Sequence, residues 1–460
     1  MSRAAALMGA MKRPGDKLML LMIALGGVLT QFLTLVSGVV AARMLGVEGR
    51  GQIVLVSVLA QMASQLTLGG SLPNAITKEL ASHGLRARDG LHGLIGRWAL
   101  WGCLGAAAAS AYFLLTGVDE VDATAAGLAV GVAIMALTGM TARILVGAML
   151  GEQADPLKIA MTGVLPQLFA TVTLSTALAL GIDWNPLEIV VVMVVCQALV
   201  LGFRLRSLKP PTNRPEDRLD RAELARIARR THIGSIGPLD GLALDRALVG
   251  SMIGSAALGL YSAAVALGSL AAMLGATVAM VALPKIAAAQ RGPRDAERAL
   301  VRRWLLMSVA VLVPTVLVFE AANPIVIPLL FGEDFRGAIA CGYWYVAAAG
   351  LLAFRRLLIV ILQGRGRGLV ASWIELALTP FVLVAVLVGS ILDDVEVVGI
   401  GMLGVALCSV VALAVSVRVL EPAPVTALRS IEDEAVVEIL NDPDAVPLEA
   451  PGSDAAVSGR

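Results

Sequence analysis

Charged residues are scarce in this sequence: they make up 15% of its 460 residues, whereas ordinary soluble domains carry about 25%. Apolar residues make up 58%. Such a composition is typical of a chain that lies mostly in lipid. The 36 Lys and Arg residues are balanced by 35 Asp and Glu residues, so the basic excess of a nucleic-acid-binding protein is missing and no nucleic-acid partner is expected.

Cysteine is also scarce, and its spacing indicates no metal site or disulfide framework. The four cysteines lie singly within apolar runs, where cysteine packs as a small apolar side chain. The sequence has no Gly-x-x-x-x-Gly-Lys-Ser/Thr motif for nucleotide phosphates. We therefore expect no metal, no cofactor and no catalytic residue. The cysteines are Cys103, Cys196, Cys341 and Cys408.

Long apolar runs recur along the chain. A helix needs about 20 such residues to cross a hydrocarbon core of about 30 Å. The predicted spans are residues 18–42, 52–76, 94–116, 123–150, 157–181, 187–205, 232–253, 256–284, 304–330, 337–363, 368–391 and 396–419. The first run is longer than the core of a cleaved signal peptide, so it is predicted to stay as a spanning helix. The predicted fold class is an all-α integral membrane protein with about twelve transmembrane helices.

Positive charge alternates between the predicted loops. Lys and Arg gather in the segments at residues 12–17, 78–88, 158, 204–230, 285–303 and 365–367, and the intervening loops are mainly acidic. The positive-inside rule places the basic segments in the cytoplasm. Only Arg43, Arg50 and Arg336 depart from this alternation. The pattern predicts a multi-pass protein of the cytoplasmic membrane with both termini in the cytoplasm.

Two segments are predicted to lie outside the bilayer. In residues 204–230, Leu219, Leu224 and Ile227 share one helical face among arginines. This segment is either an amphipathic helix at the membrane interface or a solvated linker. Residues 421–460 carry nine acidic and two basic residues and several prolines, which favours a mostly disordered tail.

Two stretches of sequence occur twice. Residues 44–53 align with 252–261, so that Gly46 and Gly51 meet Gly254 and Gly259, and residues 143–151 align with 356–364. The repeat predicts two six-helix lobes of the same orientation, with substrate between them. The glycines suit a tight turn with positive φ. The predicted units are an N-terminal lobe (1–203), a basic linker (204–231), a C-terminal lobe (232–420) and an acidic tail (421–460).

Three stretches resemble the polysaccharide flippases of the multidrug, oligosaccharidyl-lipid and polysaccharide exporter (MOP) superfamily. They are residues 42–51 (ARMLGVEGRG), 244–262 (LDRALVGSMIGSAALGLYS) and 325–335 (IVIPLLFGEDF). The resemblance implies two lobes forming a V that move an undecaprenyl-pyrophosphate-linked oligosaccharide across the bacterial inner membrane. It further implies contact with membrane lipids, and a polysaccharide polymerase and chain-length proteins as partners.

Two deep arginines are candidate ligands for the substrate diphosphate. Arg246 lies far inside the span 232–253, and Arg143 lies about two helical turns from the cytoplasmic end of its span. A guanidinium binds phosphate through parallel hydrogen bonds. For Arg143, snorkelling to the headgroups is an equal alternative; snorkelling is also predicted for Arg97, Arg355 and Arg356. The candidates for binding sugar hydroxyls are Gln31, Gln61 and Gln65, with hydrogen bonding between helices as the alternative.

Four carboxylates within predicted spans are candidate groups for coupling to protons or sodium. A charged side chain at a helix centre costs about 2.5–3.5 kcal/mol, so such a residue is functional by default. The candidates are Asp240, Asp245, Glu320 and Glu375. The alternatives are hydrogen bonds to neighbouring hydroxyls and, for Asp245, a poorly oriented pair with Arg246.

Other functions remain open at this point. A cation-coupled multidrug antiporter of the same superfamily would need a cavity rich in aromatic residues, which form only 4% of this chain. A membrane glycan polymerase or ligase would need a large outer loop, and none is predicted. A non-transporting scaffold that recruits partners through the acidic tail is a further alternative.

Overall fold

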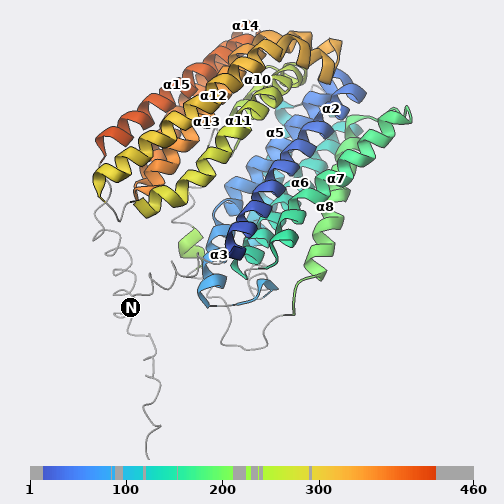
Figure 1. Cartoon of the computed structure of the whole chain (residues 1–460). Helices are drawn as coiled ribbons and strands as arrows, with labels where there is room; N and C mark the ends of the chain where they lie inside the picture. The colour runs from blue at the N-terminus through green and yellow to red at the C-terminus, as the bar shows by residue number, and fades with distance from the viewer. Residues whose placement is uncertain are drawn as a thin grey trace, which may run out of the picture.

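The computed structural model shows two groups of helices that are close together at one end, called the joined end, and apart at the other, called the separated end (Figure 1). It describes residues 14–83, 85–88, 97–117, 121–152, 154–210, 224–228, 237, 242–289 and 293–420. This part of the chain contains helices and no strand, which confirms the predicted all-α class.

The first group contains the helices that precede residue 210. They are α2 (Pro14–Ser64), the π-helix η1 (Gln65–Gly69), α3 (Leu72–His83), α5 (Arg97–Thr116), α6 (Ala123–Gly151), α7 (Pro156–Ala179) and α8 (Pro186–Arg206). Helix α2 consists of two helices joined at Gly46, whose φ of 68° and ψ of −163° are not helical. The first two predicted spans therefore form one continuous, bent element.

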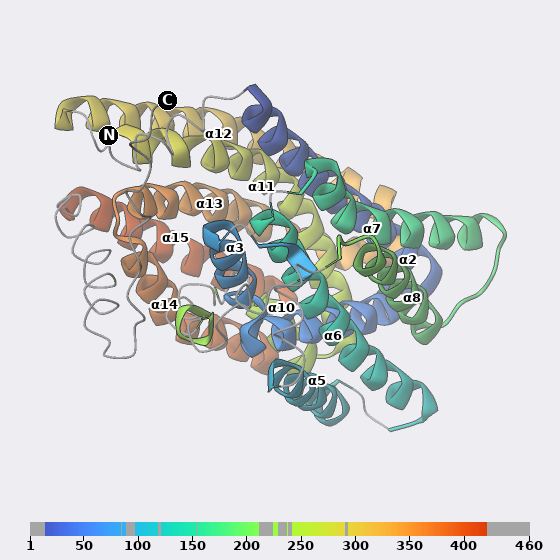
Figure 2. The same cartoon turned by 90° about the horizontal axis from the view of Figure 1, so that it is seen from below.

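The second group contains the remaining long helices. They are α10 (Leu244–Met252), α11 (Ser255–Ala289), α12 (Arg294–Phe331), the 3₁₀-helix η3 (Glu333–Gly337), α13 (Ala338–Gly364), α14 (Gly368–Leu392) and α15 (Val395–Val419). Seen from below, α12, α13, α14 and α15 lie on the opposite side of the molecule from α6, α7 and α8 (Figure 2).

Ten helices of the described residues are long and apolar enough to cross a membrane. Helix α2 is counted once among them although it contains two predicted spans, and α10, with nine residues, is too short to be counted. With these two additions the helices correspond to the twelve predicted spans. Three boundaries were predicted wrongly. Residues 43–51 are helical except at Gly46, α12 begins at Arg294 rather than at residue 304, and α10 begins at Leu244 rather than at residue 232.

Several helices begin at a side-chain cap in a loop that was predicted to lie outside. Asn185 accepts a hydrogen bond from the Glu188 N–H at 3.0 Å, and Glu188 accepts one from the Asn185 N–H at 2.7 Å. At the starts of α6 and α15, Asp122 accepts a hydrogen bond from the Ala125 N–H and Asp394 accepts one from the Glu396 N–H. Because the first N–H groups of a helix lack partners within the helix, these residues fix where each span starts.

The two groups share hydrophobic cores near the joined end. One core brings Leu55 and Phe113 of the first group together with Val249 of the second. Another brings Ala42 together with Phe331. Helix α2 makes most of this junction, because it packs against α11 and also contacts α10 and α12.

Away from the joined end, each group has a core of its own. Ile76 on α3 and Ile144 on α6 belong to a core formed within the first group and residues 224–228. Ile286 on α11 and Ile361 on α13 belong to a core formed within the second group. At the separated end in Figure 1, therefore, the side chains of each group pack within that group and not against the other group.

The repeated glycines form the closest part of the junction. A Cβ added to Gly51 would lie 1.7 Å from the carbonyl oxygen of Ser255, and one added to Gly259 would lie 2.0 Å from that of Val47. The two contacts are equivalent, because the repeat aligns Gly51 with Gly259 and Val47 with Ser255. Gly46 and Gly254 both have positive φ, 68° and 129°, as predicted.

One short stretch of the predicted linker packs against the first group. Within the described residues 224–228, Leu224 and Ala228 are buried in the core that contains α3 and α6, and Ile227 packs beside it. The described part of the predicted apolar face is therefore covered by protein. Leu219, Asp240 and the tail 421–460 lie outside the described residues, and the predicted boundaries at residues 203, 231 and 420 remain predictions.

Candidate functional site

Arg246 lies on α10, which packs against α2 and α5 of the first group and against α11 and α14 of the second. A Cβ on Gly250 would lie 2.9 Å from Leu55 Cδ1, so α10 meets α2 at this level. Arg246 is one turn earlier on α10, about 6 Å nearer the separated end. Its side chain is half-buried, and its Nε is buried without a hydrogen-bond partner among the described residues.

Asp245, the residue before Arg246, is buried and bound to the neighbouring helix. Its carboxylate accepts a hydrogen bond from the Tyr261 hydroxyl on α11 at 2.8 Å. The Tyr261 ring in turn contacts the edge of Tyr345, with ring centroids 5.4 Å apart. The structure thus pairs Asp245 with a tyrosine and not with Arg246, as expected for adjacent residues that point to different sides of a helix.

The three candidate glutamines lie along α2 and its continuation. Gln31 and Gln61 are equally far along the chain from Gly46, which places them at similar depth on the two arms of α2. Gln31 is exposed, whereas Gln61 and Gln65 are half-buried. Gln65 begins the π-helix η1, a distortion that often marks functional positions in helices.

Arg143 lies beside this distorted segment. One turn before it on α6, the Met140 sulfur accepts a hydrogen bond from the Thr67 hydroxyl in η1 at 3.7 Å. One turn after it, the carbonyl oxygen of Gly147 accepts a hydrogen bond from Thr77 on α3 at 2.8 Å. Arg143 is half-buried between these levels, and no hydrogen bond or ion pair of its side chain is found among the described residues.

Like Asp245, the candidate coupling carboxylates Glu320 and Glu375 lie within the second group. Glu320 is half-buried on α12 and its carboxylate lies against the backbone of Ala347 on α13. Glu375 on α14 forms an ion pair with Arg355 on α13, with 2.9 Å between Oε2 and the guanidinium nitrogen. No cluster of three metal-ligating side chains occurs among the described residues.

The prediction that Arg355 snorkels to the headgroups is wrong. Its side chain is 0% exposed, and Glu375, its ion-pair partner, is 11% exposed. Arg355 is near the end of its predicted span, which suggested that its side chain could reach the headgroups. In the structure, neighbouring helices cover the face of α13 that carries Arg355. An ion pair satisfies both charges within the protein, so no contact with water is needed.

Two arginines at the joined end were not predicted as functional residues. The Arg50 Nε donates a hydrogen bond to the Ser262 hydroxyl at 2.8 Å, and the guanidinium lies 4.5 Å from the centre of the Phe331 ring. The Arg43 Nε donates to the carbonyl oxygen of Leu330 at 2.8 Å. Both side chains therefore cross from the first group to the second. Their departure from the loop-charge alternation was the sequence signal for this role.

The comparisons with known proteins agree with this architecture. Residues 236–340, from α10 to the start of α13, match the family model of the polysaccharide biosynthesis proteins. No curated protein matches the sequence. The fold is similar to that of the lipid II flippase MurJ in an inward closed conformation, with a TM-score of 0.64 and 12% identity over 92% of this chain and 94% of that one.

The fold is also similar to that of multidrug resistance transporters of the MATE family. An inward-facing structure has a TM-score of 0.62 and 15% identity over 84% of this chain and 93% of that one. An outward-facing structure has a TM-score of 0.52 and 13% identity over 86% of this chain and 94% of that one. The chain has the two-lobe fold of these transporters, and the match of residues 236–340 supports the predicted resemblance to a polysaccharide flippase-type family.

Proposed function

We propose that this protein is an alternating-access flippase that moves a polyprenyl-pyrophosphate-linked oligosaccharide across the cytoplasmic membrane for polysaccharide biosynthesis. The observation that carries the proposal is the junction of the two lobes. They meet through reciprocal glycine contacts at one end and have separate cores at the other. A junction of this kind can act as a pivot for the lobes, and the match to the polysaccharide biosynthesis family favours a glycan as cargo.

In this mechanism the glycan headgroup enters between the lobes from the separated end while its lipid tail stays in the bilayer. Arg246 lies just below the junction, and Arg143 lies deeper toward the separated end, so the first and second lobes each provide one cation for the diphosphate. Gln61 on the second arm of α2 and Gln65 at the start of η1 lie at a similar depth, where amide groups can bind sugar hydroxyls. Gln31 is the corresponding candidate on the first arm.

Coupling to protons or sodium belongs to the same proposal. Asp245 is adjacent to Arg246 and is bound only to a neutral hydroxyl in the described structure, so its charge is available to a cation near the diphosphate site. Glu320 is the second candidate, on α12. Glu375 already has a cationic partner in Arg355, which leaves it the weaker candidate.

The proposal is tested by flipping in proteoliposomes. The purified protein is reconstituted with a fluorescent polyprenyl-diphosphate oligosaccharide, and a membrane-impermeant quencher reports transfer between leaflets. Arg246→Ala and Arg143→Ala should each weaken substrate binding about 10-fold to 100-fold, because a hydrogen bond from a charged group contributes about 1.5–3 kcal/mol. The corresponding Lys variants should be intermediate, since lysine keeps the charge but loses the planar group.

Arg206→Ala is the matched control, because Arg206 is an exposed arginine in the last turn of α8. It should flip the substrate at the wild-type rate. Active efflux of a cationic dye without flipping of the lipid-linked glycan would instead establish the multidrug antiporter, whose fold this chain shares. Absence of both activities in folded protein would favour the scaffold.

A further inference from the structure

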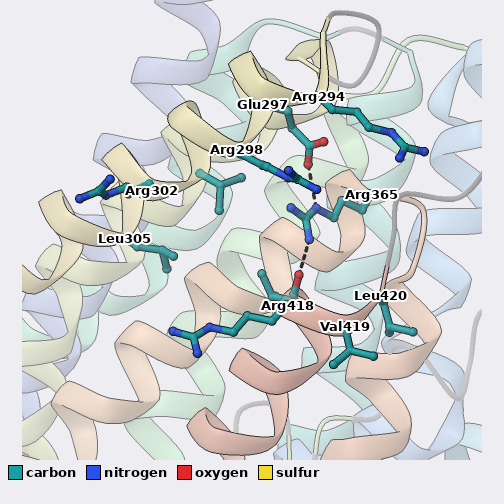
Figure 3. Close-up of a pocket in the computed structure, with 11 residues that line it drawn as sticks. Arg294, Glu297, Arg298, Arg302, Leu305, Arg365, Arg418, Val419 and Leu420 are labelled. Carbon is teal, nitrogen blue, oxygen red and sulfur yellow. Dashed lines mark hydrogen bonds and ion pairs between the residues drawn. The ribbon is translucent and has the colours of Figure 1, made fainter.

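A pocket at the separated end of the second group is lined largely by arginines (Figure 3). It lies where the first turns of α12, the end of α13 and the last turn of α15 meet. The charged side chains that line it are Arg294, Glu297, Arg298, Arg302, Arg365 and Arg418. The predicted topology places this end of the molecule at the cytoplasmic surface of the membrane.

One of these arginines has a structural role, and the others leave the pocket basic. The Arg365 Nε donates a hydrogen bond to Glu297 at 2.7 Å, and its Nη1 donates to the Val417 carbonyl oxygen at 2.5 Å. Both Arg365 and Glu297 are buried, so the one carboxylate among the described lining residues is already neutralised. Arg298 lies 4.0 Å from the exposed Asp295, a surface pair that contributes little.

The remaining arginines surround an opening between two helices. Arg302 on α12 and Arg418 on α15 extend toward the same side of the view, with Leu305 between them (Figure 3). Both arginines are exposed. Arg294, Arg298 and Arg302 follow one another at intervals of four residues, so they form a stripe along one face of α12.

This stripe continues into apolar surface. On α12 the same face presents Leu306, Val309 and Val313 to the outside, and α15 presents Val411 and Val415 on the membrane side of Arg418. The two helices therefore offer cations at the membrane boundary and exposed branched apolar side chains further into the membrane. An amphiphile with an anionic head and acyl chains matches this order of charge and hydrophobicity.

We propose that this pocket binds the headgroup of an anionic phospholipid, with the phosphate held by Arg302, Arg298 and Arg418 and the acyl chains lying along α12 and α15. The apolar walls favour a lipid over a soluble phosphate, since a soluble anion would use only the cations. They also favour it over the acidic tail that begins after Leu420, because residues 421–460 supply negative charge but no acyl chain for those walls. The site is on the outer surface of the second lobe and does not depend on the proposed cargo.

The test is native mass spectrometry of the full-length protein in detergent, titrated with phosphatidylglycerol or with phosphatidylcholine. Phosphatidylglycerol should bind the wild type more tightly than phosphatidylcholine. The double variant Arg302→Gln/Arg418→Gln should bind phosphatidylglycerol roughly 30-fold more weakly, at about 5-fold for each arginine. Arg206→Gln/Arg303→Gln removes two exposed arginines at the same end outside the pocket, and it should change binding less than about 2-fold.

Equal thermal unfolding of the two double variants shows that both fold. Equal affinity of the two double variants for phosphatidylglycerol would overturn the proposal. So would tight binding that appears only after residues 421–460 are removed, since the tail would then be the occupant. Displacement of phosphatidylglycerol by an equal concentration of inorganic pyrophosphate would also overturn it, because the site would then recognise a soluble anion.

Discussion

Arg50 is the residue whose side chain most directly links the two lobes. It binds the Ser262 hydroxyl and lies over Phe331, both on the second lobe. We expect Arg50→Ala to open the joined end more often, because the lost hydrogen bond contributes about 1.5–3 kcal/mol. The labelling rate of a cysteine introduced at the buried Ala263 should rise roughly 10-fold to 100-fold in a variant without the native cysteines.

Arg336→Ala is the control for this measurement. Arg336 is also a cation on the predicted outer side, but it pairs with the nearby Glu333 and both are exposed. Its removal should leave labelling at position 263 unchanged. If Arg50→Ala and Arg336→Ala label equally, Arg50 does not hold the lobes together.

The buried ion pair between Arg355 and Glu375 should contribute to the stability of the second lobe. Glu375→Gln leaves Arg355 buried without its counter-charge, which should cost about 3–5 kcal/mol and lower the melting temperature in detergent. Replacing both, as Arg355→Met/Glu375→Leu, should recover most of this loss, because an apolar pair needs no charge compensation. A Glu375→Gln variant that unfolds like the wild type but loses the ion dependence of transport would instead assign Glu375 to ion coupling.

At this scale the sequence predicted burial better than position in the helix or partners. The span 232–253 placed Asp245 and Arg246 deep inside a helix, which is wrong: α10 begins at Leu244, so both residues lie in its first turn, although both are at least half-buried. The partners Tyr261 and Glu375 lie on neighbouring helices, and a single sequence does not specify which faces of two helices meet. Arg355 shows the consequence. Its short distance from the helix end predicted that its side chain would snorkel, whereas packing of the neighbouring helices buries that side chain.

Among the elements, the close crossing of α2 and α11 depends on two glycines. Gly51→Ala would place a methyl group 1.7 Å from the Ser255 carbonyl oxygen, and Gly259→Ala would place one 2.0 Å from that of Val47. Neither backbone can accommodate this without moving, so each variant should shift the helices apart. Spin–spin distances across the joined end should lengthen, and flipping should fall.

Gly27→Ala is the matched control on α2. No atom lies within 4 Å of its added Cβ, and alanine favours helix by about 1 kcal/mol over glycine. It should preserve both the distances and the flipping rate. Unchanged distances in Gly51→Ala would show that the lobes are not in contact there.

Helix boundaries were predictable because apolar runs and loop charges both mark them. The bend at Gly46 was anticipated from the glycine repeat, but the continuation of helix through residues 43–51 was not, since Glu48 and Arg50 have the character of loop residues. The π-helix at Gln65–Gly69 has no signal of its own, because its residues continue the apolar run of the second span. It packs against α5 and α6, which a single sequence does not specify.

For the whole molecule, the repeat and the V-shaped arrangement have the same origin. Two aligned halves place equivalent glycines at one end, and the lobes are in close contact at that end in this structure. The greater similarity to the inward-facing than to the outward-facing MATE structure fits a molecule closed at the predicted outer end. Hydropathy does not identify the cargo, because transporters of many different substrates are built from apolar helices. The family match covers only residues 236–340.

Alternating access requires the joined end to open in every transport cycle. Cysteines replacing Val47 and Leu260, which pack against one shared core, can be linked by a short cleavable cross-linker in a variant without the native cysteines. The measurement is the rate of polyprenyl-diphosphate oligosaccharide flipping in proteoliposomes before linking, after linking and after cleavage. We predict that flipping stops on linking and returns on cleavage. Flipping by fully linked protein at the unlinked rate would contradict alternating access between the two lobes.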